Sequence, residues 1–136
     1  MEFTQKALEL EKHRAYLNEI SKEDIAHLIK SVIYHLEQKK IFQEEELKKI
    51  NLSVLTNEPF NNLYFKYNKE RLPLAGSVYL QESNDLIFIV SLCHHFKMRN
   101  PLIIRVSNSQ QSEMLEIFLQ TLSENQMKSD FINIIQ

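Results

Sequence analysis

Glycine is almost absent from this chain of 136 residues. Gly76 is the only one, whereas an average sequence of this length would contain about nine or ten. Glycine-rich turns bring backbone N–H groups against phosphate, and the chain has none of them. The sequence therefore excludes a P-loop and the glycine-dependent dinucleotide fingerprint.

Cysteine is equally scarce, and long apolar runs are missing. Cys93 is the only cysteine, so no disulfide can form within the chain and a secreted disulfide scaffold is excluded. The longest apolar run, residues 86–90, is far shorter than the roughly 20 residues that span a bilayer. Charged residues interrupt positions 1–14, which therefore do not resemble a signal peptide. We expect a cytoplasmic protein that does not bind a membrane.

Neither sign of charge dominates the sequence. The chain has 16 basic and 18 acidic residues and a net charge of -2, whereas nucleic-acid binders usually carry a basic surplus. A local basic and aromatic patch for single strands remains a third functional hypothesis, weak because neighbouring acidic residues dilute the patch. Its residues would be Lys66, Lys69, Arg71, Lys97, Arg99 and Arg105, with Tyr64 and Tyr67 nearby.

Length and composition predict one globular domain over residues 1–136. Apolar residues make up 43% of the chain and charged residues 25%, both close to the globular average. The sequence changes character near residue 55, from charged and helical to apolar and mixed. We therefore expect a helical N-terminal part over residues 1–52 and an α/β part over residues 60–136.

Helical periodicity dominates the N-terminal part. An apolar stripe at spacings of four and three predicts a first helix over residues 3–19, with Arg14 as the polar exception on the stripe. Ser21 is a candidate N-cap for a second helix over residues 22–39, and a third helix is expected over 44–50. The stripe of the first helix consists of Phe3, Ala7, Leu10, Arg14 and Leu17.

Residues 86–96 decide the fold class, because this segment is apolar on nearly every side. Polar residues at 83–85 can cap a helix start, Lys97 and Arg99 suit its last turn, and residues 100–101 (Asn-Pro) stop it. Three β-branched residues within the segment favour a strand instead. We predict a helix, and the strand remains the alternative.

The remaining elements follow from shorter patterns. Residues 102–106 read as a buried strand, and residues 110–123 as an amphipathic helix capped by Ser107 or Ser109. The apolar tail 131–135 reads as a last strand or a packed turn. Alternating residues further upstream predict strands over 63–67 and within 72–80.

The predicted architecture is α/β: an N-terminal helical hairpin followed by a small sheet whose C-terminal half runs β-α-β-α-β. Right-handed crossovers would then make the strands parallel. If residues 86–96 were a strand, the fold class would instead be α+β.

The run Cys93-His94-His95 is the first candidate for chemistry in the sequence. Consecutive helical positions point about 100° apart, so three neighbours cannot converge on one metal ion, and the other histidines lie in the N-terminal helices. A thiol nucleophile would need a suitably placed histidine and a third orienting group. We therefore predict no metal, no cofactor and no catalytic residue, which argues against an enzyme.

Two polar loops form a candidate ligand site. In open parallel sheets, ligands bind beyond the carboxyl ends of the strands, where residues 81–85 and 107–112 would lie. The alternative is that these residues only cap helices and form turns. The candidate ligand-binding residues are Glu82, Asp85, Ser107, Asn108 and Ser109.

The leading functional hypothesis is a small protein-interaction module: an adaptor, an immunity or antitoxin-type partner, a secretion chaperone or a regulatory subunit. The first two helices carry more apolar surface than a short hairpin can bury against itself, so this surface must meet the sheet or another chain. A ligand- or nucleotide-binding α/β domain is the alternative. The candidate interaction residues, for a protein partner or for self-association, are Phe3, Leu10, Leu17, Ile25 and Ile29.

Overall fold

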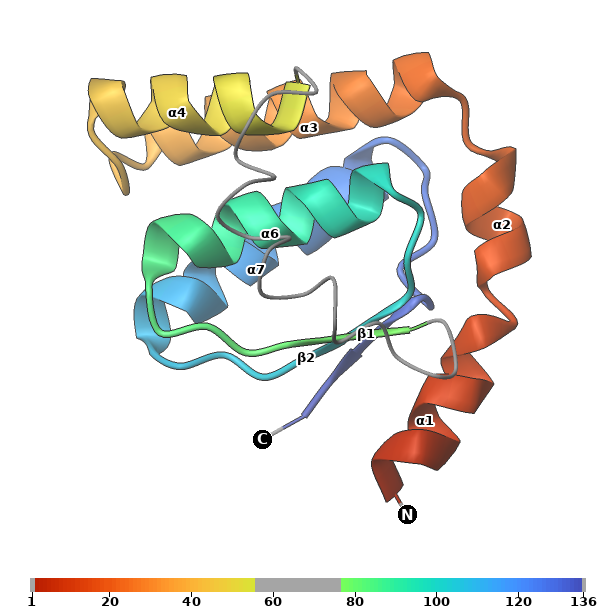
Figure 1. Ribbon diagram of the computed structural model, residues 1–136. Helices are drawn as coiled ribbons and strands as arrows, with labels where there is room; N and C mark the ends of the chain where they lie inside the picture. Colours follow the sequence, from red (N-terminus) through yellow and green to blue (C-terminus); the bar gives the residue numbers. More distant parts are fainter. Residues whose placement is uncertain (1, 56–76, 136) are drawn as a thin grey trace.

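The computed structural model describes residues 2–55 and 77–135 (Figure 1). The predicted strand at 63–67 and the start of the alternation at 72–80 lie outside these residues. The helices are α1 (Glu2–Glu11), α2 (Arg14–Glu19), α3 (Lys22–Gln38), α4 (Glu44–Leu55), α6 (Asp85–Lys97) and α7 (Ser109–Glu124). The strands are β1 (Val78–Leu80), β2 (Leu102–Ile104) and β3 (Ile132–Ile134).

The three strands form a parallel sheet in the order β1-β2-β3. Val78 is in register with Leu102, and Leu102 with Ile132. Helices α6 and α7 connect successive strands, as a parallel pair requires. The predicted β-α-β-α-β order and α/β architecture are confirmed, and the preceding block of helices also fits an α+β description.

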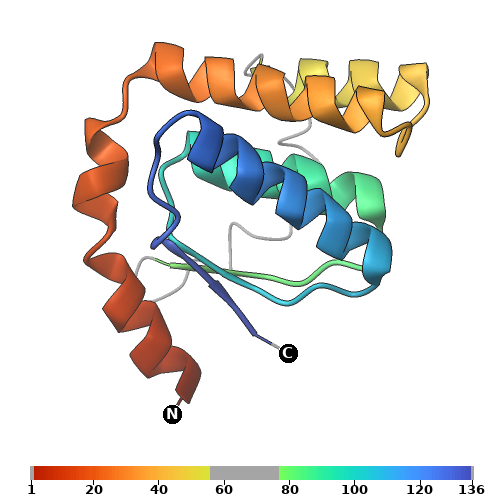
Figure 2. The same ribbon diagram turned by 180° about the vertical axis from the view of Figure 1, so that it is seen from behind.

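The elements are arranged in layers (Figures 1 and 2). Helices α6 and α7 cover one face of the sheet, here called the inner face, and α3 and α4 pack over them from the other side. Helix α1 packs against β2 on the opposite, outer face. The main core therefore lies around α6 and α7, between the sheet and the α3–α4 pair.

Helix α6 is enclosed on all sides, which explains its unusual sequence. Every residue from Phe88 to Phe96 is buried. A helix between two packed layers has no solvated face and therefore shows no apolar stripe. The terminal signals identified the helix correctly: the Asn84 side chain accepts a hydrogen bond from the Ile87 N–H at 3.0 Å, and the helix ends at Lys97.

Three helices end in the same motif without using glycine. Lys40, Arg99 and Gln126 follow α3, α6 and α7 and have φ values of 56°, 61° and 59°. At each end the next residue donates its N–H to the carbonyl five positions back, as in a Schellman motif; for α3 this is Ile41 to Leu36 at 3.3 Å. The scarcity of glycine is thus met by left-handed residues that carry side chains.

The predicted helix over residues 3–19 is wrong in one respect, because it is broken at Lys12–His13 into α1 and α2. The His13 N–H bonds the Leu10 carbonyl at 2.9 Å, three positions back rather than four. The stripe could not reveal the break, because no proline or glycine marks it. The third predicted helix is also longer than expected and extends to Leu55.

Candidate functional site

The structure brings the two predicted polar loops together at the carboxyl ends of β1 and β2. The Ser107 hydroxyl donates a hydrogen bond to the Glu82 carbonyl at 3.0 Å. The Asn108 amide donates to the Asp85 carboxylate at 2.9 Å. Ser109, the first residue of α7, is exposed. The parallel topology thus juxtaposes Glu82, Asp85, Ser107 and Asn108.

Gln111 completes this arrangement, and sequence reasoning missed it. Its amide nitrogen donates to the Glu82 carbonyl at 2.6 Å and to the Asp85 carboxylate at 3.1 Å, and its oxygen accepts from the Ser107 N–H at 2.9 Å. The signal was present: Gln111 stands three positions before buried Met114 on the apolar stripe of α7. We call Glu82, Asp85, Ser107, Asn108 and Gln111 the loop network.

The cap of α7 corrects the prediction that Ser107 or Ser109 caps this helix. The Asn108 side chain accepts from the Gln111 N–H at 2.8 Å and is the N-cap. Asparagine suits this position as well as serine does, and its amide nitrogen remains available for Asp85. The groups of the loop network are therefore largely engaged with one another, and a ligand would have to replace these hydrogen bonds.

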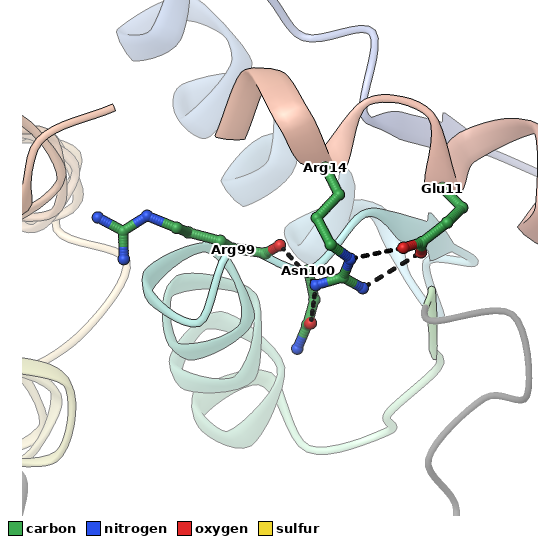
Figure 3. A network of polar contacts seen from close by, with 4 residues as sticks. All are labelled: Glu11, Arg14, Arg99 and Asn100. Atoms are coloured by element: carbon green, nitrogen blue, oxygen red, sulfur yellow. Dashed lines mark hydrogen bonds and ion pairs between the residues drawn. The ribbon is translucent and has the colours of Figure 1, made fainter. Parts of the chain in front are cut away.

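A second polar network lies at the other end of α6 (Figure 3). The Arg14 guanidinium donates from Nη1 to the Arg99 carbonyl and to Asn100 Oδ1, both at 3.1 Å. Its Nε and Nη2 donate to the Glu11 carboxylate at 2.7 and 3.3 Å. Arg14, the polar exception on the apolar stripe, therefore joins the N-terminal helices to the end of α6.

Arg99 makes the reciprocal contact. Its Nη2 donates to the Ile20 carbonyl at 2.9 Å, just after α2. Each arginine thus donates to a backbone carbonyl of the other's segment, which suits the negative end of a helix dipole. Arg99, a candidate for the basic patch, is engaged here in a structural contact.

His95 extends this network into the core. Asn100 Nδ2 lies 3.3 Å from His95 Nδ1. Because Asn100 Oδ1 already accepts from Arg14, its amide nitrogen faces the ring and His95 Nδ1 must accept the hydrogen bond. We call Glu11, Arg14, Arg99, Asn100 and His95 the Arg14 network.

Both buried histidines are held neutral. Burial, and then the neighbouring His94, lower the pKa of His95 from its ordinary value of 6.5 to about 3. Burial, and then the positive charge of Lys97, lower the pKa of His94 to about 4. Neutral imidazole is the form that can accept at Nδ1, so the titration state agrees with the geometry of the Arg14 network.

Cys93 belongs to the main core, next in sequence to the two buried histidines. It is fully buried, and burial raises the pKa of its thiol to about 12, so the sulfur carries a proton. The thiolate is the nucleophilic form, and this environment opposes it. Within residues 2–55 and 77–135, no three His, Cys, Asp or Glu side chains are grouped so that they could hold a metal ion.

The candidate interaction residues lie largely inside the chain. Leu17, Ile25 and Ile29 belong to the main core. Leu10 is buried against Ile103 of β2 in a separate cluster, while the side chain of Phe3 lies outside the described part. Four of the five candidate interaction residues are thus covered by other elements of the same chain.

Exposed apolar residues occur at other positions. Leu8 on α1 is 60% exposed and Tyr79 on β1 is 45% exposed. Of the basic-patch candidates, the two tyrosines and the three basic residues before Gly76 lie outside the described residues. None of the described helices has the length and apolar character needed to cross a membrane.

Comparisons of this chain with protein-family models, with curated proteins and with solved structures found no match.

Proposed function

We propose that this chain is a protein-binding module, and that its binding surface lies on the outer side of the sheet. Parallel sheets are normally covered on both faces. Among the described elements, α6 and α7 cover the inner face, and α1 packs against the central strand β2 of the outer face. The observation that carries the proposal is the exposure of Tyr79, which lies beside buried Ile103 on the outer face.

Leu8 is a second exposed apolar side chain on the outer side of the molecule. Two helical positions separate it from Leu10, so the two side chains point about 200° apart. Because Leu10 faces the sheet, Leu8 faces outward on the same side of the molecule. We call these two exposed side chains, Leu8 and Tyr79, the outer patch; tyrosine is enriched at the energetic centres of protein interfaces.

The outer patch favours a partner that offers an apolar surface rather than a strongly charged one. An adaptor, an immunity or antitoxin-type protein, a secretion chaperone and a regulatory subunit would all act through such a contact. They differ in the identity of the partner. The common physical step is burial of Leu8 and Tyr79 against another protein.

The test compares two exposed tyrosines. A tagged protein carrying Tyr79→Glu or Leu8→Glu should lose a partner that the wild type retains in its native cell, because a buried charge without a counterion opposes association. Tyr34→Glu is the matched control, since Tyr34 is 57% exposed on α3, on the other side of the molecule. Equal capture by all four proteins, or no specific partner for any of them, would contradict the proposal.

Ligand binding at the loops is a second candidate, favoured by the juxtaposition of Glu82, Asp85, Ser107 and Asn108 beyond parallel strands. A small molecule with donor and acceptor groups would bind there by replacing hydrogen bonds of the loop network. Thermal-shift screening against nucleotides, sugars and carboxylates should then give a hit that Ser107→Ala or Asn108→Ser weakens. A hit that neither substitution affects would place the ligand elsewhere.

A further inference from the structure

We propose that helix α1 is exchanged between two copies of this chain, so that α1 of each copy lies on the outer sheet face of the other. Helix α1 packs against β2 through Leu10 and Ile103, with Ile135 beside them, in a cluster separate from the main core. A contact between elements joined by a hinge can form between copies with the same residues. The exchange would therefore preserve this cluster.

The connection between α1 and α2 has the geometry of a hinge. His13 already has helical angles, φ −82° and ψ −6°, so a change of about 35° in ψ would bring it to the regular helical value. Neither Lys12 nor His13 is a helix breaker. His13 therefore lies close to the conformation that it would have in a continuous helix over residues 2–19.

The sequence pattern supports the continuous helix. The stripe through Leu10, Arg14 and Leu17 keeps helical spacing across the break, as it would in one straight helix. Figures 1 and 2 both show α1 turning toward the sheet relative to α2. Straightening the helix would direct α1 away from its own sheet, which would leave Leu10 and Ile103 uncovered until a second copy provides the same contact.

The exchange preserves the hydrogen bonds between Arg14 and the end of α6. Arg14 is the first residue of α2, so its bonds to the Arg99 carbonyl and to Asn100 do not depend on the position of α1.

The proposal also goes beyond the proposed function. It rests on the contact of Leu10 with Ile103 and not on the exposure of Leu8 or Tyr79, so the two proposals can fail separately.

The decisive experiment mixes two single-cysteine variants. Protein with Leu10→Cys and protein with Ile103→Cys are unfolded, refolded together and treated with a short thiol crosslinker. A covalent dimer containing one copy of each variant is expected, because residues 10 and 103 meet between chains only after exchange. Cys93 is fully buried and its pKa is raised to about 12, so treated wild type should give no such product.

The double variant Leu10→Cys/Ile103→Cys tests whether the substituted protein folds and whether the crosslinker can span the two cysteines. If it crosslinks within one chain while the mixed single variants give no covalent dimer, the proposal is overturned. A covalent heterodimer in the mixture supports it directly.

A cysteine-free pair of hinge variants tests the same proposal if the buried substitutions impair folding. Lys12→Ala/His13→Ala favours the continuous helix, whereas Lys12→Gly/His13→Gly disfavours it. Sedimentation equilibrium should show a dimer that is at least about tenfold tighter for the alanine pair, since each dimer contains two hinges. Equal dissociation constants, or an alanine pair that stays monomeric, would overturn the proposal.

Discussion

The polar groups at the two ends of helix α6 obtain their hydrogen-bond partners in different ways. At its start, Asn84 caps the helix locally, and the loop network joins it to the neighbouring crossover. At its end, the polar groups meet a side chain from far away in the sequence, because Arg14 reaches Arg99 and Asn100. The first end joins two adjacent crossovers that the parallel strand order brings together, whereas the second end depends on a side chain from the N-terminal helices.

The three Schellman motifs sharpen this comparison. After α3 and α7, apolar residues occupy the two positions that usually touch in this motif, Ile41 with Leu36 and Met127 with Leu122. After α6 the same two positions hold Asn100 and His95, joined by a hydrogen bond. The end of α6 thus has a polar network where the other two helix ends have an apolar contact. Such a network stabilises the fold only while every polar group in it has a hydrogen-bond partner.

Removing the Arg14 guanidinium should give the largest effect. Arg14→Met keeps most of the side-chain volume but leaves the Arg99 carbonyl, Asn100 Oδ1 and Glu11 without their donor. We expect a loss of about 3 kcal/mol in the free energy of unfolding, measured in urea, because part-buried acceptors are left unsatisfied. Lys12→Met, an exposed neighbour, is the control and should change stability little. Equal effects of the two substitutions would show that the Arg14 network contributes no stability.

Low pH should destabilise the protein through two histidines at the same end of α6. The folded-state pKa values of His94 and His95 lie below 6.5, at about 4 and about 3, so the unfolded chain binds more protons as the pH falls. Each histidine should then reduce the free energy of unfolding by about 2 kcal/mol between about pH 8 and about pH 5.

The pH dependence is checked by urea unfolding across that range with His95→Gln, which keeps an acceptor for Asn100 but does not titrate. The variant should lose about half of the slope that the two histidines cause. His27→Gln is the control, because His27 is exposed on α3. An unchanged slope in His95→Gln would show that this histidine is accessible to protons in the folded state.

The start of α6 and α7 should respond more weakly. Asn108→Ala removes both the cap of α7 and the contact with Asp85, and we expect a loss of about 1–2 kcal/mol in thermal or urea unfolding. Ser109→Ala should cost much less, because Ser109 is the first residue of α7 and not its cap. The reverse order would restore Ser109 as the cap.

Glycine substitution should affect protein stability differently at the three helix ends. Gln126→Gly and Lys40→Gly relieve a left-handed residue and should stabilise the protein by about 0.5–1 kcal/mol each. Arg99→Gly relieves the same φ but removes the bond to the Ile20 carbonyl, so its gain should vanish or become a loss. Equal stabilisation at all three positions, measured by thermal unfolding, would contradict a structural role for the Arg99 side chain.

These differences explain what could be predicted from the sequence. The helix over 86–96, the strand at 102 and the parallel order followed from signals within a few residues of one another, such as the cap at Asn84 and the stop at Asn100-Pro101. The proximity of Glu82 to Ser107 followed from topology alone. Gln111 was missed because a polar residue on a buried stripe was read as part of a loop.

The Arg14 network was beyond sequence reasoning for a physical reason. Its members are contributed by α1, α2 and the end of α6, and Arg14 and Asn100 are 86 positions apart. The sequence shows Arg14 as a polar exception on its apolar stripe, but no local pattern predicts which carbonyl accepts its hydrogen bond. The break at Lys12–His13 was hidden for the same reason, since the preference for α1 to lie against β2 is tertiary.

The enclosure of α6 has a consequence for how the chain can be divided. In Figure 1, the lower side of α6 faces the sheet and its upper side faces α3 and α4. The residues that bury α6 therefore come from both sides of the change in composition near residue 55. A recombinant fragment starting after α4 would carry an open apolar surface along its central helix and would tend to aggregate. The two halves are therefore best expressed as one polypeptide or as co-produced pieces that can reassemble.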